Sequence, residues 1–383
     1  MARSNKDVLG YNLTDGLYSV LPINRGEPSA CIIEKGLFMF TVTKEDISRV
    51  LSDFGIFSDV VTFSELQRYH YEKNNPLSKE VRLIIKVNLN NGQSVVVRFK
   101  NESDVTLKVI NEQSRFAKFL ADNGIRTPAL FMANHEYARW YTINRYDVIV
   151  TVEEFVTGEI HTVSEEIAEK TGRLLAQMHN IAEAGTIHVQ NSVLFDPLRK
   201  NELFSFQSFQ EQKDFLLAVD EPLYKDIVEE YDSLFQKICT FKNEPRYAVQ
   251  GDISNCNLYQ TADGEVGVFD FNRCGDNVLY YDAIMQAIFE ARLMDYPKEI
   301  EGNQEDVILP AFLRGYHRER PFTDKQKDVF PYLYAMISAF WLGSIQFDED
   351  SLCHAIESGD TESVHKWMKK IHRRIVFRPE ITL

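Results

Sequence analysis

The sequence predicts an α+β protein that folds into two lobes. Strand-like segments with alternating apolar residues dominate the first 155 residues, and helical periodicity dominates the remainder. One further hairpin, within Tyr247–Gly275, interrupts the helical part and carries several polar residues. Such segregation of strands and helices is typical of α+β folds. We therefore expect an N-terminal lobe over residues 1–155, with an extra strand-rich extension over 1–43, and a C-terminal lobe over 156–383.

The composition is that of a folded protein with a substantial core. The chain has 383 residues, of which 44% are hydrophobic and 26% charged. Its net charge of −15 argues against nonspecific binding to nucleic acid or to an anionic membrane. The five cysteines are scattered without a Cys-x-x-Cys pair, which favours a reducing compartment over a disulfide framework or a zinc site. Since the sequence also shows neither a signal peptide nor a long apolar stretch, we expect a cytoplasmic protein.

A hairpin signal in the N-terminal lobe places two basic residues on a sheet. Asn91-Gly92 joins two strand-like segments, and a two-residue loop is the usual reading of this dipeptide. Such a loop sets Arg98 opposite Ile85 and Lys100 opposite Leu83, on the apolar face. A guanidinium on a buried face needs an anionic partner.

The following helix, expected over residues 103–123, offers such a partner. Glu112 falls in its apolar stripe, between Val109 and Phe116. We therefore predict an ion pair between Arg98 and Glu112. The alternative is that both side chains extend to solvent at the edge of the sheet.

The hairpin of the C-terminal lobe predicts a cation site. Asp263-Gly264 indicates a two-residue type I′ turn, which would place Asn257 directly opposite Asp270, with Cβ atoms roughly 5 Å apart. An amide oxygen beside a carboxylate suits a divalent cation. Asp252 lies just before the first strand, where it could approach a substrate hydroxyl. The alternative is a hairpin with two polar ends and a loop aspartate.

These residues are the components that phosphoryl transfer needs: a cation, a basic residue for the phosphates and a carboxylate for the attacking hydroxyl. Asp252-x-x-x-x-Asn257, followed by Asp270-Phe271-Asn272, resembles the aminoglycoside phosphotransferase family. That family includes choline and homoserine kinases and has a protein-kinase-like fold. The resemblance covers residues 45–345 and also includes these segments: Val96-Val97-Arg98-Phe99 as the nucleotide-contacting strand, Gly124–Pro128 as a link, Glu153-Glu154-Phe155 as the hinge and Gly172–His179 as the helix after it.

The resemblance implies a catalytic role for Asp252, which would orient or deprotonate the acceptor hydroxyl. Asn257 and Asp270 would bind Mg²⁺ on the phosphates of ATP. Arg98, held by Glu112, would contact the phosphates.

Further roles follow from the same resemblance. The backbone of Glu154, Phe155 and Val156 would bind adenine, and the buried Asp282 would brace the catalytic loop. Two positions depart from the usual pattern. Gln250 replaces a histidine that braces the same loop, and Arg98 stands where lysine is commoner, so that Lys100 is an alternative phosphate contact.

The resemblance therefore implies an ATP- and Mg²⁺-dependent kinase that phosphorylates a small-molecule alcohol. Amino alcohols, homoserine-like compounds, aminoglycosides and sugars are all candidate acceptors. One alternative is a protein Ser/Thr kinase, although no Ala-Pro-Glu element follows Asp270. Another alternative is a nucleotide-binding regulator without turnover. The expected contributors to the acceptor site are these four: Arg273, Asp276, Glu290 and Asp295.

Overall fold

The computed structural model describes residues 40–69, 80–103, 105–199, 205–293, 305–341, 343–347 and 350–383. The described chain divides into two compact units, residues 40–157 and residues 158–383, which we call the sheet unit and the helical unit. Most of the extension expected over residues 1–43 lies outside the described residues. Among the described helices, none is both long enough and apolar enough to cross a membrane.

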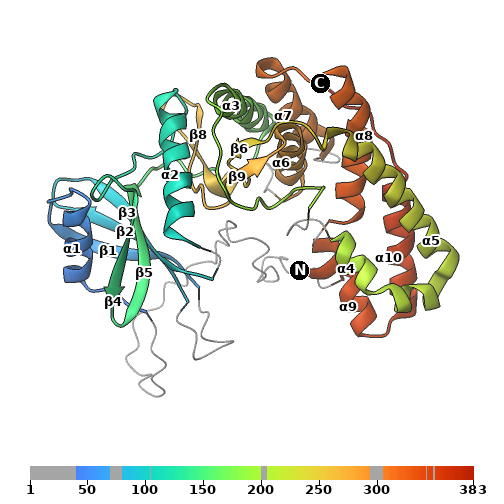
Figure 1. Cartoon of the computed structure of the whole chain (residues 1–383), viewed down its shortest axis with the longest axis horizontal. Coiled ribbons are helices and arrows are strands. Elements are labelled where there is room, and N and C mark those ends of the chain that lie inside the picture. Colours follow the sequence, from blue (N-terminus) through green and yellow to red (C-terminus); the bar gives the residue numbers. More distant parts are fainter. Residues whose placement is uncertain are drawn as a thin grey trace, which may run out of the picture. The chain divides into compact units, whose positions relative to one another are not determined.

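The sheet unit is an antiparallel sheet with one helix on each face (Figure 1). One face is covered by helix α1 (Lys44–Asp53) and the other by helix α2 (Leu107–Asp122). Thr43 begins α1 with a capping box, in which its hydroxyl accepts the N–H of Asp46 and the Asp46 carboxylate accepts the N–H of Thr43. In the described chain the strand order is β1-β2-β3-β5-β4, with these bounds: β1 (Val60–Tyr69), β2 (Val81–Leu89), β3 (Ser94–Asn101), β4 (Ala138–Ile143) and β5 (Tyr146–Glu154).

The two faces of this sheet differ in chemistry. The face toward α1 carries the main core, in which Val97 and Phe99 of β3 pack with Ile47 of the helix. Successive strand residues point to opposite faces, so Arg98 and Lys100 lie on the face of α2. The apolar contacts on that face are fewer, and they include Ile149 of β5.

The register between β2 and β3 corrects the prediction made from Asn91-Gly92. Leu89 donates its N–H to the carbonyl of Gln93, so the loop has one residue more than expected, and Gly92 closes it with a left-handed φ of 86°. A three-residue loop that ends in a left-handed glycine is the common alternative to a two-residue turn. Arg98 therefore lies opposite Ile84, not Ile85. Because a shift of one residue exchanges the faces of a strand, Arg98 and Lys100 leave the apolar face to which the sequence had assigned them.

The helical unit consists mainly of packed helices, with two short β-ribbons (Figure 1). Strand β6 (Tyr247–Val249) pairs with β9 (Gly275–Asn277), and β7 (Leu258–Gln260) pairs with β8 (Val266–Val268). The helices have these bounds: α3 (Glu165–Ala184), α4 (Phe206–Glu211), α5 (Lys213–Ile238), α6 (Leu279–Leu293), α7 (Glu305–Glu319), α8 (Asp324–Ala339), α9 (Leu352–Glu357) and α10 (Thr361–Ile375).

Helices α3 and α7 approach each other closely at two glycines. A Cβ on Gly172 of α3 would lie 2.0 Å from the carbonyl oxygen of Phe312 in α7. A Cβ on Gly315 of α7 would lie 1.9 Å from the carbonyl oxygen of Glu169 in α3. The absence of side chains at both positions is what permits this crossing. It fixes the position of α3, which carries the buried His179.

Candidate active site

The β7–β8 hairpin corrects the second predicted register. Thr261 donates its N–H to the carbonyl of Glu265, and Gly264 closes a three-residue loop with a φ of 82°. Asn257 therefore aligns with Phe269 and not with Asp270. The N–H of Phe269 donates to the carbonyl of Asn257 at 2.9 Å. Asp270 follows the end of β8 with a left-handed φ of 57°. The expected face-to-face pairing of Asn257 and Asp270 is therefore wrong.

The side chain of Gln250 connects the catalytic loop to Asp270. Its Oε1 accepts a hydrogen bond from the N–H of Asp252 at 2.7 Å, and its Nε2 donates to the carbonyl of Asp270 at 2.8 Å. Gln250 is fully buried, so neither bond competes with water. A glutamine amide carries both a donor and an acceptor, which this double contact requires.

Gly251 was not among the residues predicted from the sequence, although the turn before Asp252 depends on it. Gly251 has a φ of 81°, and a Cβ there would lie 2.6 Å from the carbonyl oxygen of Arg273. Both the backbone conformation and the close approach exclude a larger residue.

Asn257 and Asp270 fit a divalent cation by the chemistry of their oxygens. The Nδ2 of Asn257 donates to the carbonyl of Asp252 at 2.8 Å and to its Oδ2 at 3.2 Å, which fixes the orientation of the amide. The Oδ1 of Asn257 is buried and has no hydrogen-bond partner among the described residues. The carboxylate of Asp270 is nearly buried as well, and its Oδ1 accepts from the backbone N–H of Asn272 at 3.3 Å. A small set of oxygen ligands is typical of Mg²⁺ that also binds substrate phosphates.

Asp282 lies in the core, and its link to the catalytic loop passes through Gln286, which was not among the residues predicted from the sequence. Its Oδ2 is 3.0 Å from Nε2 of His179, and its Oδ1 accepts from Nε2 of Gln286 at 3.3 Å. Gln286 in turn accepts the N–H of Ile253 at 2.9 Å through its Oε1. Gln286 lies one helical turn after Asp282 on the same face of α6, and this spacing is visible in the sequence.

In the sheet unit, Arg98 forms an ion pair with Glu153, which was not among the partners expected for it. Its Nη2 and Nε lie 2.7 Å and 3.1 Å from Oε1 of Glu153 on β5. The Oε1 of Glu112 lies 3.6 Å from Nζ of Lys108, one turn earlier in α2. Arg98 is paired with Thr151 across the strands, so Glu153 is its neighbour on the same face and within easy reach. Glu153 is therefore a carboxylate that holds Arg98, and the expected pair between Arg98 and Glu112 stays a prediction. Lys100 is buried on the same face.

The hinge segment has one backbone donor that the fold does not use. The N–H of Glu154 donates to the carbonyl of Ala129 at 2.8 Å, and that of Phe155 donates to Ser94 at 3.0 Å. The N–H of Val156 has no partner within the described chain. Of the three expected hinge residues, Val156 is thus the one whose amide can donate to a base.

Two of the four residues expected at the acceptor site, Asp276 and Glu290, have positions typical of residues that stabilise the fold. Asp276 accepts the N–H of Val189 at 2.8 Å and lies 2.9 Å from Nδ1 of His188, so it fixes a turn. Glu290 is fully buried in α6. Arg273 is partly buried, and Asp295 lies outside the described residues.

The buried carboxyl of Glu290 leads to a prediction about stability and pH. Burial raises its pKa well above the ordinary 4.5, although the nearby Thr171 hydroxyl acts in the opposite direction. The folded state therefore binds this proton more tightly, and stability falls as the pH rises from 4.5 toward the raised pKa. We expect Glu290→Gln to be more stable than the wild type at neutral pH, with a difference that grows by up to about 1.4 kcal/mol per pH unit.

Urea unfolding of both proteins across a range of pH values measures this difference. The exposed Glu357, changed to Gln, is the matched control and should leave the pH profile unchanged. Parallel profiles for Glu290→Gln and the wild type would contradict the prediction.

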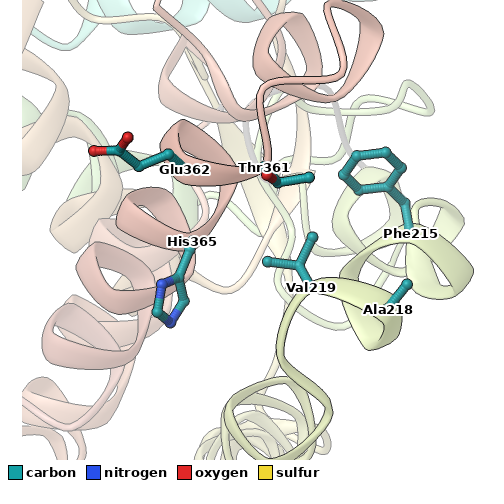
Figure 2. A pocket seen from close by; sticks show the side chains of 6 residues that line it. All are labelled: Phe215, Ala218, Val219, Thr361, Glu362 and His365. Carbon is teal, nitrogen blue, oxygen red and sulfur yellow. The ribbon is translucent and has the colours of Figure 1, made fainter.

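A pocket of about 490 Å³ lies at the surface of the helical unit, between α5 and α10. Figure 2 shows Phe215, Ala218 and Val219 on one side and Thr361, Glu362 and His365 on the other. His365 lies 2.9 Å from Asp220, where α5 is kinked. None of the predicted site residues lines this pocket.

Comparison with solved structures identifies the fold. A microcompartment-associated aminopropanol kinase aligns with a TM-score of 0.54 and 14% identity, over 86% of this chain and 95% of that one. An amicoumacin kinase in complex with AMP-PNP, Ca²⁺ and Ami aligns with a TM-score of 0.49 and 18% identity, over 88% and 95% of the two chains. Choline kinase from Streptococcus pneumoniae aligns with a TM-score of 0.44 and 14% identity, over 87% and 98%. The first of these confirms the expected kinase-like α+β fold.

Comparison with protein families tests the resemblance that the motifs indicated. A search among curated proteins gives no match. The sequence matches the phosphotransferase enzyme family over residues 83–322, which include Arg98, Asp252, Asn257 and Asp270. The expected family and enzyme class are confirmed by this match. The chain belongs to the phosphotransferase enzyme family.

Proposed function

We propose that the protein is a kinase that transfers a phosphoryl group from ATP to a hydroxyl of a small molecule. The observation that carries this proposal is the arrangement of Asn257. Its amide nitrogen holds Asp252, while its buried amide oxygen has no hydrogen-bond partner in the described chain and suits a cation. The same residue thereby couples the acceptor side of the reaction to the phosphate side.

Asp252 would act on the acceptor hydroxyl. Its carboxylate would accept the hydroxyl proton while the oxygen forms its bond to phosphorus and the bond to the leaving phosphate breaks. The hydrogen bond from Asn257 to Oδ2 keeps this carboxylate in one orientation. Mg²⁺, held by Asn257 and Asp270, would supply stabilisation of negative charge on the phosphates.

The proposed contribution of the sheet unit is nucleotide binding. Arg98, positioned by Glu153, would contact the phosphates, with Lys100 as the alternative contact. The N–H of Val156 would donate to the base. We accordingly propose that residues 1–155 are the nucleotide-binding lobe and that residues 156–383 carry the catalytic loop and the acceptor site. The cytoplasmic location expected from the cysteine pattern stays a prediction.

The pairing of Arg98 with Glu153 predicts an effect on nucleotide affinity. Both side chains are largely buried, so Glu153→Gln replaces a charged partner of the guanidinium with a neutral one and weakens its hold on the Arg98 side chain. We expect the Kd for MgATP to rise about tenfold, which corresponds to about 1.4 kcal/mol. Isothermal titration calorimetry measures it.

Glu136 provides the matched control in the same unit. It pairs with Arg115 at 2.6 Å, and both side chains are about half exposed. Exposed ion pairs contribute little, so Glu136→Gln should bind MgATP as the wild type does. Equal affinities for all three proteins would show that Glu153 does not position Arg98 for binding.

A turnover assay tests the proposed function itself. Wild type and Asp252→Asn would be incubated with MgATP and a panel of amino alcohols, hydroxy amino acids, aminoglycosides and sugars, and phosphorylated products would be detected by mass spectrometry. We expect at least one acceptor to be phosphorylated by the wild type, and none by Asp252→Asn at a comparable rate. MgATP binding without turnover on any acceptor would favour a regulatory protein, and turnover on Ser/Thr peptides alone would favour a protein kinase.

A further inference from the structure

A continuous set of buried polar side chains connects the last turn of α7 to the catalytic loop. The hydroxyl of Tyr316 lies 2.8 Å from Nδ1 of His179, and Nε2 of His179 lies 3.0 Å from Asp282. Asp282 accepts from Gln286, and Gln286 accepts the N–H of Ile253, the residue that follows Asp252. All five residues are buried. Bonds of this kind strengthen one another where water is excluded.

The direction of every bond in this set can be assigned. The Asp282 carboxylate is an acceptor, so Nε2 of His179 carries the hydrogen. Burial raises the pKa of Tyr316, so the phenol keeps its proton and can donate it to Nδ1 of the His179 tautomer that carries its hydrogen on Nε2. Gln286 donates through Nε2 and accepts through Oε1. The carboxylate of Asp282 therefore accepts from both His179 and Gln286. The Oε1 of Gln286 accepts from the backbone N–H of Ile253.

We infer that Gln286 is a positioning residue for Asp252 and that it transmits to the catalytic loop the alignment set by Asp282, His179 and Tyr316. This inference rests on the proposed function, because it assigns the loop amide a role in aligning Asp252. Ile253 is fully buried, and its N–H is fixed by Gln286 alone in the described chain. The N–H of Asp252 is fixed by Gln250. Gln250 and Gln286 thus bind the successive backbone amides of Asp252 and Ile253. Together the two hydrogen bonds fix the backbone from which the Asp252 side chain extends.

The contact made by Gln286 is electrically neutral, which has a chemical consequence. A carboxylate at this position would place a second negative charge beside Asp282 and close to Asp252. The amide supplies the same acceptor without that charge. Asp282 meanwhile has two donors of its own, from α3 and from α6.

Gln286→Leu tests the role of the amide. We expect the kcat for phosphate release from MgATP to fall by about tenfold to hundredfold, because the carboxylate loses its alignment. The KM for ATP should stay within about twofold, since the nucleotide contacts are untouched. Hydrogen exchange followed by mass spectrometry should show faster exchange in the segment 251–254, by about tenfold or more. Gln177→Leu is the matched control, because Gln177 of α3 donates to Glu319 of α7 and not to the catalytic loop. It should leave both the kcat and the exchange rate unchanged.

Gln286→Glu is the second variant, and its readout is the pH profile. A protonated glutamate can donate to Asp282 and accept from Ile253, whereas an ionised one repels Asp282. The titratable groups near this position are Asp282 and Glu290, one turn before and one turn after it on α6, and Asp252 in the catalytic loop. His179 on α3 and Tyr316 on α7 reach it only through Asp282. We expect the ratio of the kcat of this variant to that of the wild type to fall at least about tenfold between about pH 5.5 and 8.5.

The inference is overturned if Gln286→Leu keeps the wild-type exchange rate in segment 251–254, or if the kcat ratio of Gln286→Glu does not change with pH. The exchange measurement needs no turnover. A wild type without phosphate release would therefore count against the proposed function, while the exchange rates would still decide the role of Gln286.

Discussion

Asp270→Asn is expected to lower the rate of phosphoryl transfer by more than about a hundredfold. Charge stabilisation by a bound metal contributes several kcal/mol to such reactions, and each 1.36 kcal/mol corresponds to a factor of ten. The substitution removes the negative charge while it preserves the shape of the side chain. Its Oδ1 can still accept from the backbone of Asn272, so the left-handed turn at this position should survive.

Initial rates measured as a function of Mg²⁺ concentration would show this loss. We expect the concentration of Mg²⁺ needed for half-maximal rate to rise as well, because one anionic ligand has become neutral. Asp263 in the loop of the same hairpin provides a matched control, and Asp263→Asn should keep both the rate and the Mg²⁺ dependence. Wild-type Mg²⁺ dependence in Asp270→Asn would remove Asp270 from the cation site.

Gly172→Ala is expected to lower the free energy of unfolding by about 2–3 kcal/mol. In an isolated helix alanine is more favourable than glycine by about 1 kcal/mol, so propensity alone predicts the opposite sign. The new Cβ would lie 2.0 Å from the carbonyl oxygen of Phe312, which is a backbone atom that cannot move without its helix. Helices α3 and α7 must therefore separate.

Urea denaturation of the purified variants measures the effect. Gly124→Ala is an informative comparison, because its Cβ would meet nothing within 4 Å and the cost is only that of a left-handed φ of 94°. That cost is about 1–2 kcal/mol. Gly315→Ala should resemble Gly172→Ala, since it disturbs the same crossing. A Gly172→Ala protein as stable as the wild type would contradict this account of the crossing.

Much of the fold and family could be predicted from the sequence because the signals are local. Helix periodicity, the spacing from Asp252 to Asn257 and the Asp270-Phe271-Asn272 motif lie in short segments. The order of strands and helices along the chain then indicates the fold class. These features need no knowledge of distant contacts.

The two register errors have one cause. Asn91-Gly92 and Asp263-Gly264 are compatible with a two-residue type I′ turn and equally with a three-residue loop that ends in a left-handed glycine. Both hairpins adopt the longer loop, with Gly92 and Gly264 as the left-handed residues. Dipeptide identity does not distinguish the two forms, since the glycine meets the demand of each.

The partners of buried polar groups were beyond local reasoning for a different reason. The distance from Arg98 to Glu153 depends on the pairing of β3 with β5, and the contact from Gln286 to Ile253 depends on how α6 packs. Each of these follows from the packing of segments far apart in the sequence. A residue type can indicate that a partner is needed, but the packing determines which partner it is.

The ion pair between Arg98 and Glu153 bears on regulation. When the carboxylate that holds a phosphate-binding cation lies on a movable helix, displacement of that helix can switch the site off. Here the carboxylate lies in the strand next to Arg98, and backbone hydrogen bonds join the two strands on both sides of the pair. Displacement of α2 would leave this pair intact. We therefore expect the pair between Arg98 and Glu153 to be a fixed property of the sheet.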